Sequence, residues 1–300
     1  MIVEGRGSRL LRSIFTPRLD RGRAERVHRE FDDHRGFRAY HDACRAAFAR
    51  DAKAPSAPIN ETGFEYVEVM SPARAEDLLG RATATGPLTY VKKDTRNLEG
   101  FRLEEPRLVE EILSAALPEV VDDRAVRFFG SEYLVHWFTL TRTAPAPEQP
   151  SVSFRWHCDK GPRGHLKLLV YLNATDEHGG TTALIDLTET ARLARTGYLF
   201  GPAGRRTGDL AFLSRLAGSE LHECRRALRA GEGLLFQPAS VLHRGISPQQ
   251  GPRVVLTLCL LPSPIHWSEA FRRGAMSDLA QDDKWPRHAS ELLRDMGLRA

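Results

Sequence analysis

The stretch FRWHCDKGPRGHLKLLVYLN, residues 154–173, decides the fold. It places His157 two residues before Asp159, inside a run of strand-forming residues. In a helix, residues two positions apart point about 200° away from each other, whereas on a strand they lie on the same face. The two side chains can therefore share one ligand only if this segment is extended, and the run HLKLLVYLN that follows is typical of a second strand.

The bulk composition is that of an ordinary folded protein. The chain has 300 residues, of which 41% are hydrophobic and 27% charged, enough for one large domain or two modest ones. Its net charge of +4 is mild, and its arginines are interleaved with acidic residues, so the sequence gives no indication of nucleic-acid binding. A small-molecule partner is expected instead.

Targeting and cysteine patterns indicate a cytoplasmic protein. The N-terminal residues have no apolar signal core, and no stretch of 18 uninterrupted apolar residues occurs. The arginine-rich opening is interpreted as a solvated basic arm or helix in preference to an organelle transit peptide. The four cysteines are far apart and form no C-x-x-C pair, so neither a zinc knuckle nor a disulfide framework is predicted.

The chain changes character near residue 130. Residues 1–130 read mainly as helices with short extended pieces. Apolar residues recur at helical spacing in three segments: 25–52, 72–82 and 104–117. Ser71 is a plausible N-cap for the second of these helices, and residues 62–69 between the first two are expected to form a short strand.

The part that follows is rich in β-strand. Short runs of strand-forming residues, bounded by Gly, Pro and Asn, occupy 132–143, 152–158, 165–173, 181–187, 233–238 and 253–261. Many short strands separated by turn signals predict a sandwich or barrel. We expect a single domain over 1–300: a helical part at 1–130, a β core at 131–262 with a helical, Gly-rich insertion at 187–220, and C-terminal helices at 263–300.

A second motif lies downstream, GEGLLFQPASVLHRGISPQQGPRVVLTLCLLPS, residues 231–263. It reads as a strand, a tight turn, a strand carrying His243, a polar loop and a strand opened by Arg253. One carboxylate and two imidazoles on neighbouring strands form a facial triad, which leaves three positions of an octahedral Fe(II) open. A guanidinium at the barrel rim suits bidentate binding of a carboxylate, which is what 2-oxoglutarate needs when its other end chelates iron.

Any one of these residues, taken alone, is better explained as a hydrogen-bonded polar residue at a strand end. The ordered set of His157, Asp159, His243 and Arg253 favours the metal site. A cupin-like protein that keeps a metal for binding or another non-redox purpose, without turnover of 2-oxoglutarate, remains the alternative.

With these motifs in place, residues 130–262 resemble the iron(II)/2-oxoglutarate-dependent dioxygenases, phytanoyl-CoA dioxygenase-like branch. The likeness is carried by WHCD, by LVYLNATDEHGGTTAL and by GEGLLFQPASVLHRG followed by Arg253. It implies a mainly β core with flanking helices, folded as a double-stranded β-helix (jelly roll, cupin-like). It also implies Fe(II), 2-oxoglutarate and O2, with iron bound by His157, Asp159 and His243 and the distal carboxylate of 2-oxoglutarate bound by Arg253.

The sequence departs from that branch at two places. Val255 stands where many members have Ser or Thr as a second carboxylate partner, so another residue must help Arg253. Strand alternation over 165–173 nominates Lys167 or Tyr171, although Lys167 also reads as a surface cation. The segment IDLTET replaces the usual Pro-Gly-Ser-His turn, and this leaves the substrate class open.

The expected reaction is hydroxylation, or another oxidation, of an unactivated C–H bond of a small metabolite or biosynthetic intermediate, with release of succinate and CO2. A halogenase of this architecture would have a small residue at position 159 in place of the carboxylate. In the segment GPAGRRTGD, residues 201–209, Arg205 and Arg206 are predicted either to recruit an anionic substrate from a mobile lid or to lie in a solvated surface loop.

Overall fold

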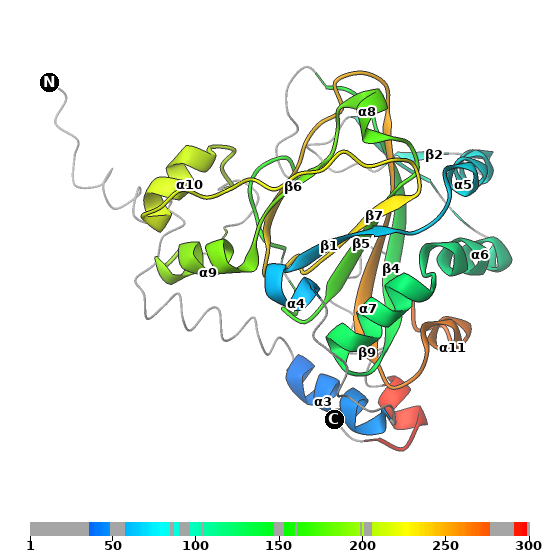
Figure 1. Ribbon diagram of the computed structural model, residues 1–300. Coiled ribbons are helices and arrows are strands. Elements are labelled where there is room, and N and C mark those ends of the chain that lie inside the picture. The colour runs from blue at the N-terminus through cyan, green and yellow to red at the C-terminus, as the bar shows by residue number, and fades with distance from the viewer. Residues whose placement is uncertain are drawn as a thin grey trace, which may run out of the picture.

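The described chain is built on two facing β-sheets with helices outside them (Figure 1). The computed structural model describes residues 36–48, 58–84, 87–89, 97–101, 103, 105–146, 153–159, 161–198, 200, 206–276 and 291–298. No helix within these ranges has both the length and the apolar character needed to cross a membrane.

The larger sheet has seven strands in the order β1-β7-β5-β9-β4-β3-β2, and all its neighbouring strands are antiparallel. Its strands are β1 (Phe64–Glu68), β2 (Pro87–Thr89), β3 (Leu98–Phe101), β4 (Glu132–Thr143), β5 (Leu166–Tyr171), β7 (Glu232–Phe236) and β9 (Arg253–Ser263). The smaller sheet pairs β6 (Thr182–Ile185) with β8 (Leu242–Gly245). Two antiparallel sheets that face each other form the expected double-stranded β-helix, so the predicted fold class is confirmed.

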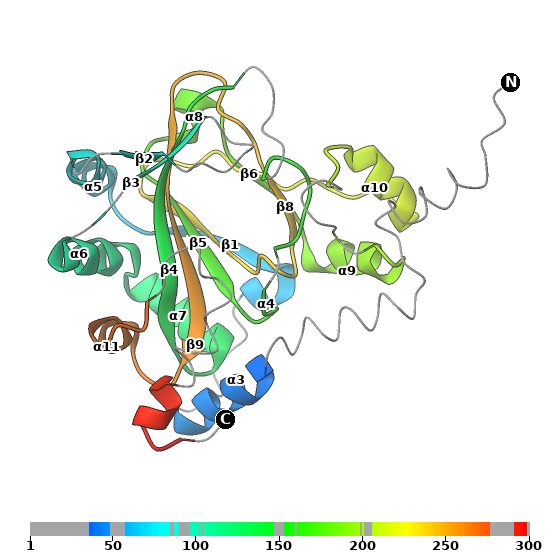
Figure 2. The same ribbon diagram turned by 180° about the vertical axis from the view of Figure 1, so that it is seen from behind.

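Helices cover both outer faces of this sandwich (Figures 1 and 2). The helices are α3 (Phe37–Ala47), α4 (Ile59–Thr62), α5 (Pro72–Ala84), α6 (Pro106–Ala116), α7 (Glu119–Phe129), α8 (Thr175–His178), α9 (Leu187–Arg195), α10 (Leu210–Ala217) and α11 (Trp267–Arg272). Helices α5, α6, α7 and α11 lie over the outer face of the larger sheet, and α9 and α10 lie beyond the smaller one. The predicted insertion therefore forms the α9–α10 cover.

Strand alternation sorts the central strand β5 into two faces. Leu166, Leu168 and Val170 are buried in the main core against helices α5 to α7. Lys167, Leu169 and Tyr171 point the other way, into the space between the sheets. A strand covered on both sides reads as a nearly continuous apolar run, and a charged residue inside such a run needs a partner.

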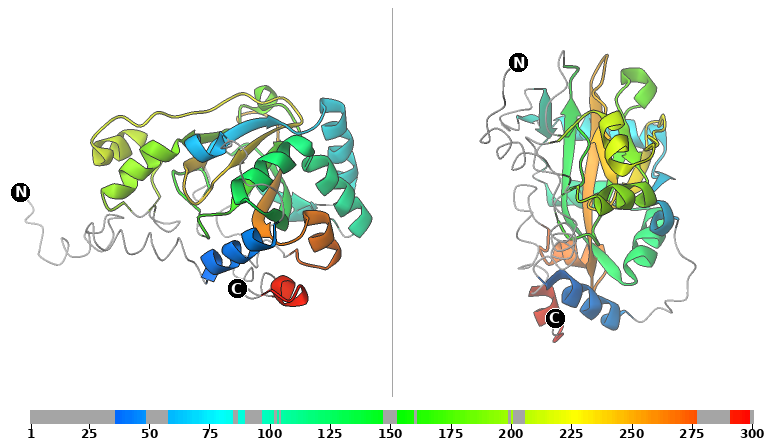
Figure 3. Two further views of the ribbon diagram at one scale, coloured as in Figure 1. Left: turned by 60° about the horizontal axis from the view of Figure 1, so that its bottom comes forward. Right: turned by 90° about the vertical axis from the view of Figure 1, so that its left-hand side faces the viewer.

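Helix α3 and the C-terminal residues 291–298 form a small separate core at one end of the sandwich (Figure 3). Tyr40 on α3 donates its hydroxyl to the carbonyl of Pro262 at 2.6 Å, which fastens this end to β9. All four cysteines are free thiols. The single-domain prediction with its internal boundaries stays a prediction, and much of its N-terminal part, residues 1–35, lies outside the described residues.

Candidate metal centre

The smaller sheet positions the two histidines. The backbone N–H of His157 donates to the carbonyl of His243 at 2.9 Å, and the N–H of His243 returns a bond of 2.9 Å to the carbonyl of His157. Trp156 and Cys158 alternate to the opposite face, where they pack in one cluster with Leu242. The alternation that the sequence required is therefore present around His157, although residues 153–155 form turns where the sequence predicted strand.

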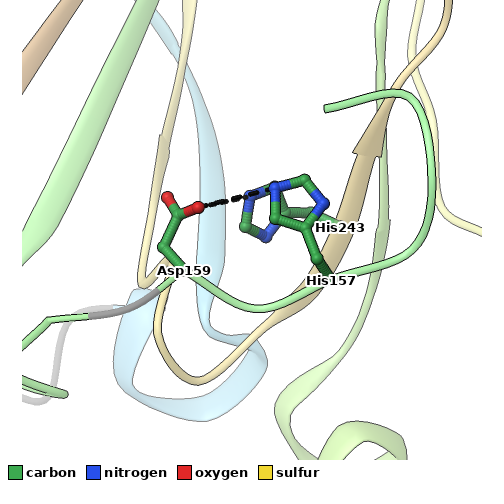
Figure 4. A group of neighbouring side chains, drawn as sticks. All are labelled: His157, Asp159 and His243. Carbon is green, nitrogen blue, oxygen red and sulfur yellow. Dashed lines mark ion pairs between the residues drawn. The ribbon is translucent and has the colours of Figure 1, made fainter. Parts of the chain in front are cut away.

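His157, Asp159 and His243 converge from this arrangement (Figure 4). One donor atom of each lies within 4.8 Å of the other two, and this is the one such cluster of three in the described ranges. Oδ1 of Asp159 is 3.5 Å from Nε2 of His157 and 3.8 Å from Nε2 of His243. The imidazole rings lie 4.3 Å apart between centroids. Three donors at these separations are close enough to bind one ion.

Backbone carbonyls orient both imidazoles. Nδ1 of His157 lies 2.7 Å from the carbonyl oxygen of Arg155, and Nδ1 of His243 lies 2.9 Å from that of Val241. A carbonyl oxygen only accepts hydrogen bonds, so each Nδ1 carries the proton and each Nε2 keeps a lone pair. This is the tautomer that a metal-binding histidine requires.

The charges also suit a cation. Burial lowers the pKa of His243 to about 3, so this imidazole is neutral at ordinary pH. Burial alone would raise the pKa of Asp159, but the positive charge of the Lys167 ammonium opposes this effect and holds that pKa well below its usual value. The cluster thus combines an ionised carboxylate with two nitrogen donors, the set that Fe(II) binds in facial triads.

The triad opens onto a cavity of about 220 Å³ between the sheets. The cavity is lined by Asn97, Leu98, Thr141, Thr143, Ser153, Phe154, His157, Asp159, Lys167, Leu169, Thr182, Phe236, His243, Gly245, Arg253 and Thr257. The three candidate metal ligands and Arg253 therefore line the same cavity.

Arg253 is a partly buried cation whose neighbours are backbone carbonyls and an aromatic ring. Its Nη1 donates to the carbonyls of Thr181 at 3.1 Å and Ile246 at 3.4 Å, and its guanidinium lies over the Phe154 ring at 5.9 Å. Its Nε is buried without a hydrogen-bond partner among the described residues, and no carboxylate in those ranges pairs with it. Burial lowers its pKa. A guanidinium in this state is suited to an anion that enters the cavity.

Tyr171 lies behind the Arg253 end of the cavity. Its buried hydroxyl is 2.9 Å from Oγ1 of Thr182, a residue that lines the cavity. Tyr171 also faces Val255 across the β5–β9 pair. Position 255 has no hydroxyl because it is a valine. Thr182, which belongs to the smaller sheet, offers a hydroxyl at this end of the cavity instead.

Lys167 lies at the other end of the cavity. Its Nζ donates to Oδ2 of Asp159 at 2.6 Å and sits 5.0 Å from the centroid of the Trp137 ring. Its side chain is 18% exposed, so it is not a surface cation. It pairs with Cys259 on β9, six residues and about 20 Å of strand from Arg253. The structure therefore places Lys167 beside Asp159, a candidate metal ligand, and not beside Arg253.

Arg206, the remaining candidate within the described residues, is not part of the cavity lining. Arg206 is half-buried; burial lowers its pKa while the negative charge of Asp159 acts in the opposite direction, so it lies within electrostatic reach of the triad. The neighbouring Thr207 accepts a bond from the backbone N–H of Trp156 at 2.8 Å, so the end of the insertion pairs beside the triad. Arg205 lies outside the described residues.

Some residues in and next to the cavity had no signal in the motifs. Trp137 under Lys167, Phe154 under Arg253, and Thr182 become neighbours of the site only through the pairing of distant strands. Thr257 shares a strand face with Arg253, so alternation along 253–261 was the signal that could have indicated it.

No family model matches the sequence, and no curated protein matches it. Several solved structures are similar in fold. The epimerase SnoN, in complex with Fe3+, alpha ketoglutarate and nogalamycin RO, has 11% identity and a TM-score of 0.48, covering 75% of this chain and 85% of that one. EctD from S. alaskensis, with 2-oxoglutarate and 5-hydroxyectoine, has 16% identity and a TM-score of 0.46, covering 74% and 84%.

HygX from Streptomyces hygroscopicus, with nickel, 2-oxoglutarate and hygromycin B bound, has 13% identity and a TM-score of 0.42, covering 69% of this chain and 86% of that one. At identities of 11%, 16% and 13%, the three structures resemble this chain in fold.

Proposed function

We propose that this chain is an Fe(II)- and 2-oxoglutarate-dependent oxygenase that oxidises a small molecule. One observation carries the proposal: a His-Asp-His donor set and a partly buried arginine without a carboxylate partner in the described ranges open onto the same cavity. A 2-oxo dicarboxylic acid has a chelating end and an anionic end. It would therefore satisfy both features at once.

In this proposal the protein binds and orients. His157, Asp159 and His243 would hold the metal on one face, and Arg253 would fix the far carboxylate of the co-substrate. When bound, Fe(II) and 2-oxoglutarate would supply the activation of O2 and the oxidation of a C–H bond. The sheets on either side of the cavity would exclude water from the reacting groups.

The size of the cavity constrains what else enters. At about 220 Å³ it is smaller than most ligand pockets, which occupy roughly 300–1,000 Å³. Once 2-oxoglutarate is bound, only the reacting part of a substrate would fit beside the metal. We propose hydroxylation of a small metabolite as the reaction, with desaturation or ring formation open to the same donor set.

An anionic substrate agrees with the position of Arg206. This half-buried guanidinium lies within electrostatic reach of Asp159, at the point where the insertion returns to the smaller sheet. We propose that Arg206 contacts the substrate from outside the cavity. The same role for Arg205 stays a prediction.

Thr182 is proposed as the second partner of the distal carboxylate, held in place by Tyr171. A neutral hydrogen bond contributes about 0.5–1.5 kcal/mol, so Thr182→Val should raise the KM for 2-oxoglutarate by about 2- to 10-fold. Tyr171→Phe removes only the hydroxyl that bonds to Thr182, and it should have a smaller effect that does not add to that of Thr182→Val. Steady-state kinetics of the two single variants and the double variant test this, and additive effects would contradict it.

The proposal is tested by incubating the purified full chain with Fe(II), 2-oxoglutarate and O2, without added substrate, and measuring succinate. Slow release of succinate that disappears in Asp159→Ala is expected. The alternative, a cupin-like metal-containing binding or non-redox protein, would bind Fe(II) and release no succinate. Adding 2-oxoglutarate to the Fe(II) protein without O2 separates the two further, because chelation produces a new visible absorption band.

A further inference from the structure

Asp159 and Lys167 form a close ion pair at the metal end of the cavity. Nζ of Lys167 donates to Oδ2 of Asp159 at 2.6 Å, and the two side chains are 18% and 20% exposed. Charge-assisted hydrogen bonds of this length are among the stronger polar contacts in proteins. The pair is therefore a specific contact between a candidate metal ligand and a residue that is not one.

The contact gives the two carboxylate oxygens of Asp159 different neighbours. Oδ1 lies 3.5 Å and 3.8 Å from the Nε2 atoms of His157 and His243, whereas Oδ2 is taken up by Lys167. A carboxylate can bind a metal through one oxygen or through both, and the second mode uses an additional coordination position. With Oδ2 engaged by the ammonium, only Oδ1 is presented toward the histidines.

Lys167 is itself held in place. It lies on the central strand β5, with Phe236 opposite it on β7 and Cys259 opposite it on β9. Its ammonium lies 5.0 Å from the centroid of the Trp137 ring, within the range of a cation–π contact. A lysine fixed by two neighbouring strands and an aromatic ring can set the orientation of the carboxylate that it contacts.

From these contacts we propose that Lys167 is a positioning residue, which restricts Asp159 to one metal-binding oxygen and thereby keeps the remaining coordination positions open for co-substrate and O2. This inference rests on the proposed function, because it requires a metal at the triad. It also gives Lys167 a role different from that of an anchor for 2-oxoglutarate.

The test is anaerobic titration of the full chain with Co(II), which reports affinity and coordination number through its visible absorption. The variants are Lys167→Met, which removes the donor and the charge, Lys167→Arg, which retains both, and Lys167→Gln, which retains a donor without charge. Thr257→Val is the matched control, because it changes the same cavity wall without touching Asp159.

Loss of a group that orients a ligand usually costs 10- to 100-fold in metal affinity, so we expect about that loss in Lys167→Met. We also expect an altered visible spectrum of Co(II) in this variant, because Oδ2 would take a coordination position that water or co-substrate otherwise occupies. Lys167→Arg should restore most of the affinity and the wild-type spectrum, Lys167→Gln should fall between, and Thr257→Val should match wild type. Circular dichroism of each metal-free variant checks folding, and Lys167→Gln decides the matter if Lys167→Met does not fold.

Two results would overturn the inference. Unchanged affinity and spectrum in Lys167→Met and Lys167→Gln would reduce the ion pair to a structural contact. Tighter binding in these variants would show that the ammonium acts on the metal only as a repelling charge. Failure of the proposed function looks different: wild-type protein would then bind Co(II) no better than Asp159→Ala.

Discussion

Replacing Asp159 with alanine is expected to reduce Fe(II)-dependent conversion of 2-oxoglutarate to background, and to weaken Fe(II) binding by at least about 100-fold. The substitution removes the one carboxylate of the donor set and leaves the ammonium of Lys167 facing the two imidazoles. His157→Ala and His243→Ala each remove a neutral donor and leave Asp159 paired with Lys167. We therefore expect Asp159→Ala to bind metal most weakly of the three, and the losses in turnover not to add in double variants, because the three residues act on one ion.

The ion pair between Asp159 and Lys167 provides a control for this prediction. In Asp159→Ala the ammonium of Lys167 keeps its place in the cavity wall without its carboxylate partner. Breaking a fully buried pair costs about 3–5 kcal/mol of stability, and this largely buried pair should cost less. The double variant Asp159→Ala/Lys167→Met removes both charges and should recover much of that stability, as measured by thermal unfolding. It should still fail to bind Fe(II). Recovery of Fe(II)-dependent turnover in the double variant would remove Asp159 from the ligand set.

The sequence predicted the long strands of the core better than the short strands that pair beside them. The runs at 132–143 and 253–261 became β4 and β9 because their β-branched and aromatic residues suit a sheet that is covered on both faces. The short strands β2 and β3 and the helix α7 were not predicted. Strand β3 is held by pairing with β4, and β2 by pairing with β3, more than by their own composition.

The same limit applies to the site. His157 and Asp159 were recognisable because alternation is a local property, and His243 and Arg253 because of their order on consecutive strands. The pairing of Lys167 with Asp159 depends on where β5 lies relative to the triad, which no local pattern encodes. Thr182 likewise reaches the Arg253 end only through the register of β6 against β8. Contacts between distant strands are set by register, and a single sequence specifies register weakly.

Replacing Arg253 tests the opposite end of the cavity. A hydrogen bond to a charged partner contributes about 1.5–3 kcal/mol, so Arg253→Ala should weaken 2-oxoglutarate binding by about 10- to 150-fold. Fe(II) binding should survive, because Arg253 contacts carbonyls of Thr181 and Ile246 and none of the three donors. Arg253→Lys should recover only part of the affinity, since an ammonium cannot reproduce the planar two-point contact of a guanidinium.

Stability provides a second readout of that prediction. A ligand that binds only the folded state stabilises it by RT ln(1 + [L]/Kd), so saturating 2-oxoglutarate with a redox-inert divalent metal should raise the Tm of the wild type far more than that of Arg253→Ala. Without co-substrate the difference in Tm between the two proteins should narrow or reverse, because the wild type then carries a guanidinium whose buried Nε has no hydrogen-bond partner in the described ranges. An equal rise in Tm on adding 2-oxoglutarate to both proteins would show that another cation of the cavity binds the distal carboxylate. Lys167→Met would then be the variant that loses the shift, which would also contradict the assignment of Lys167 to Asp159.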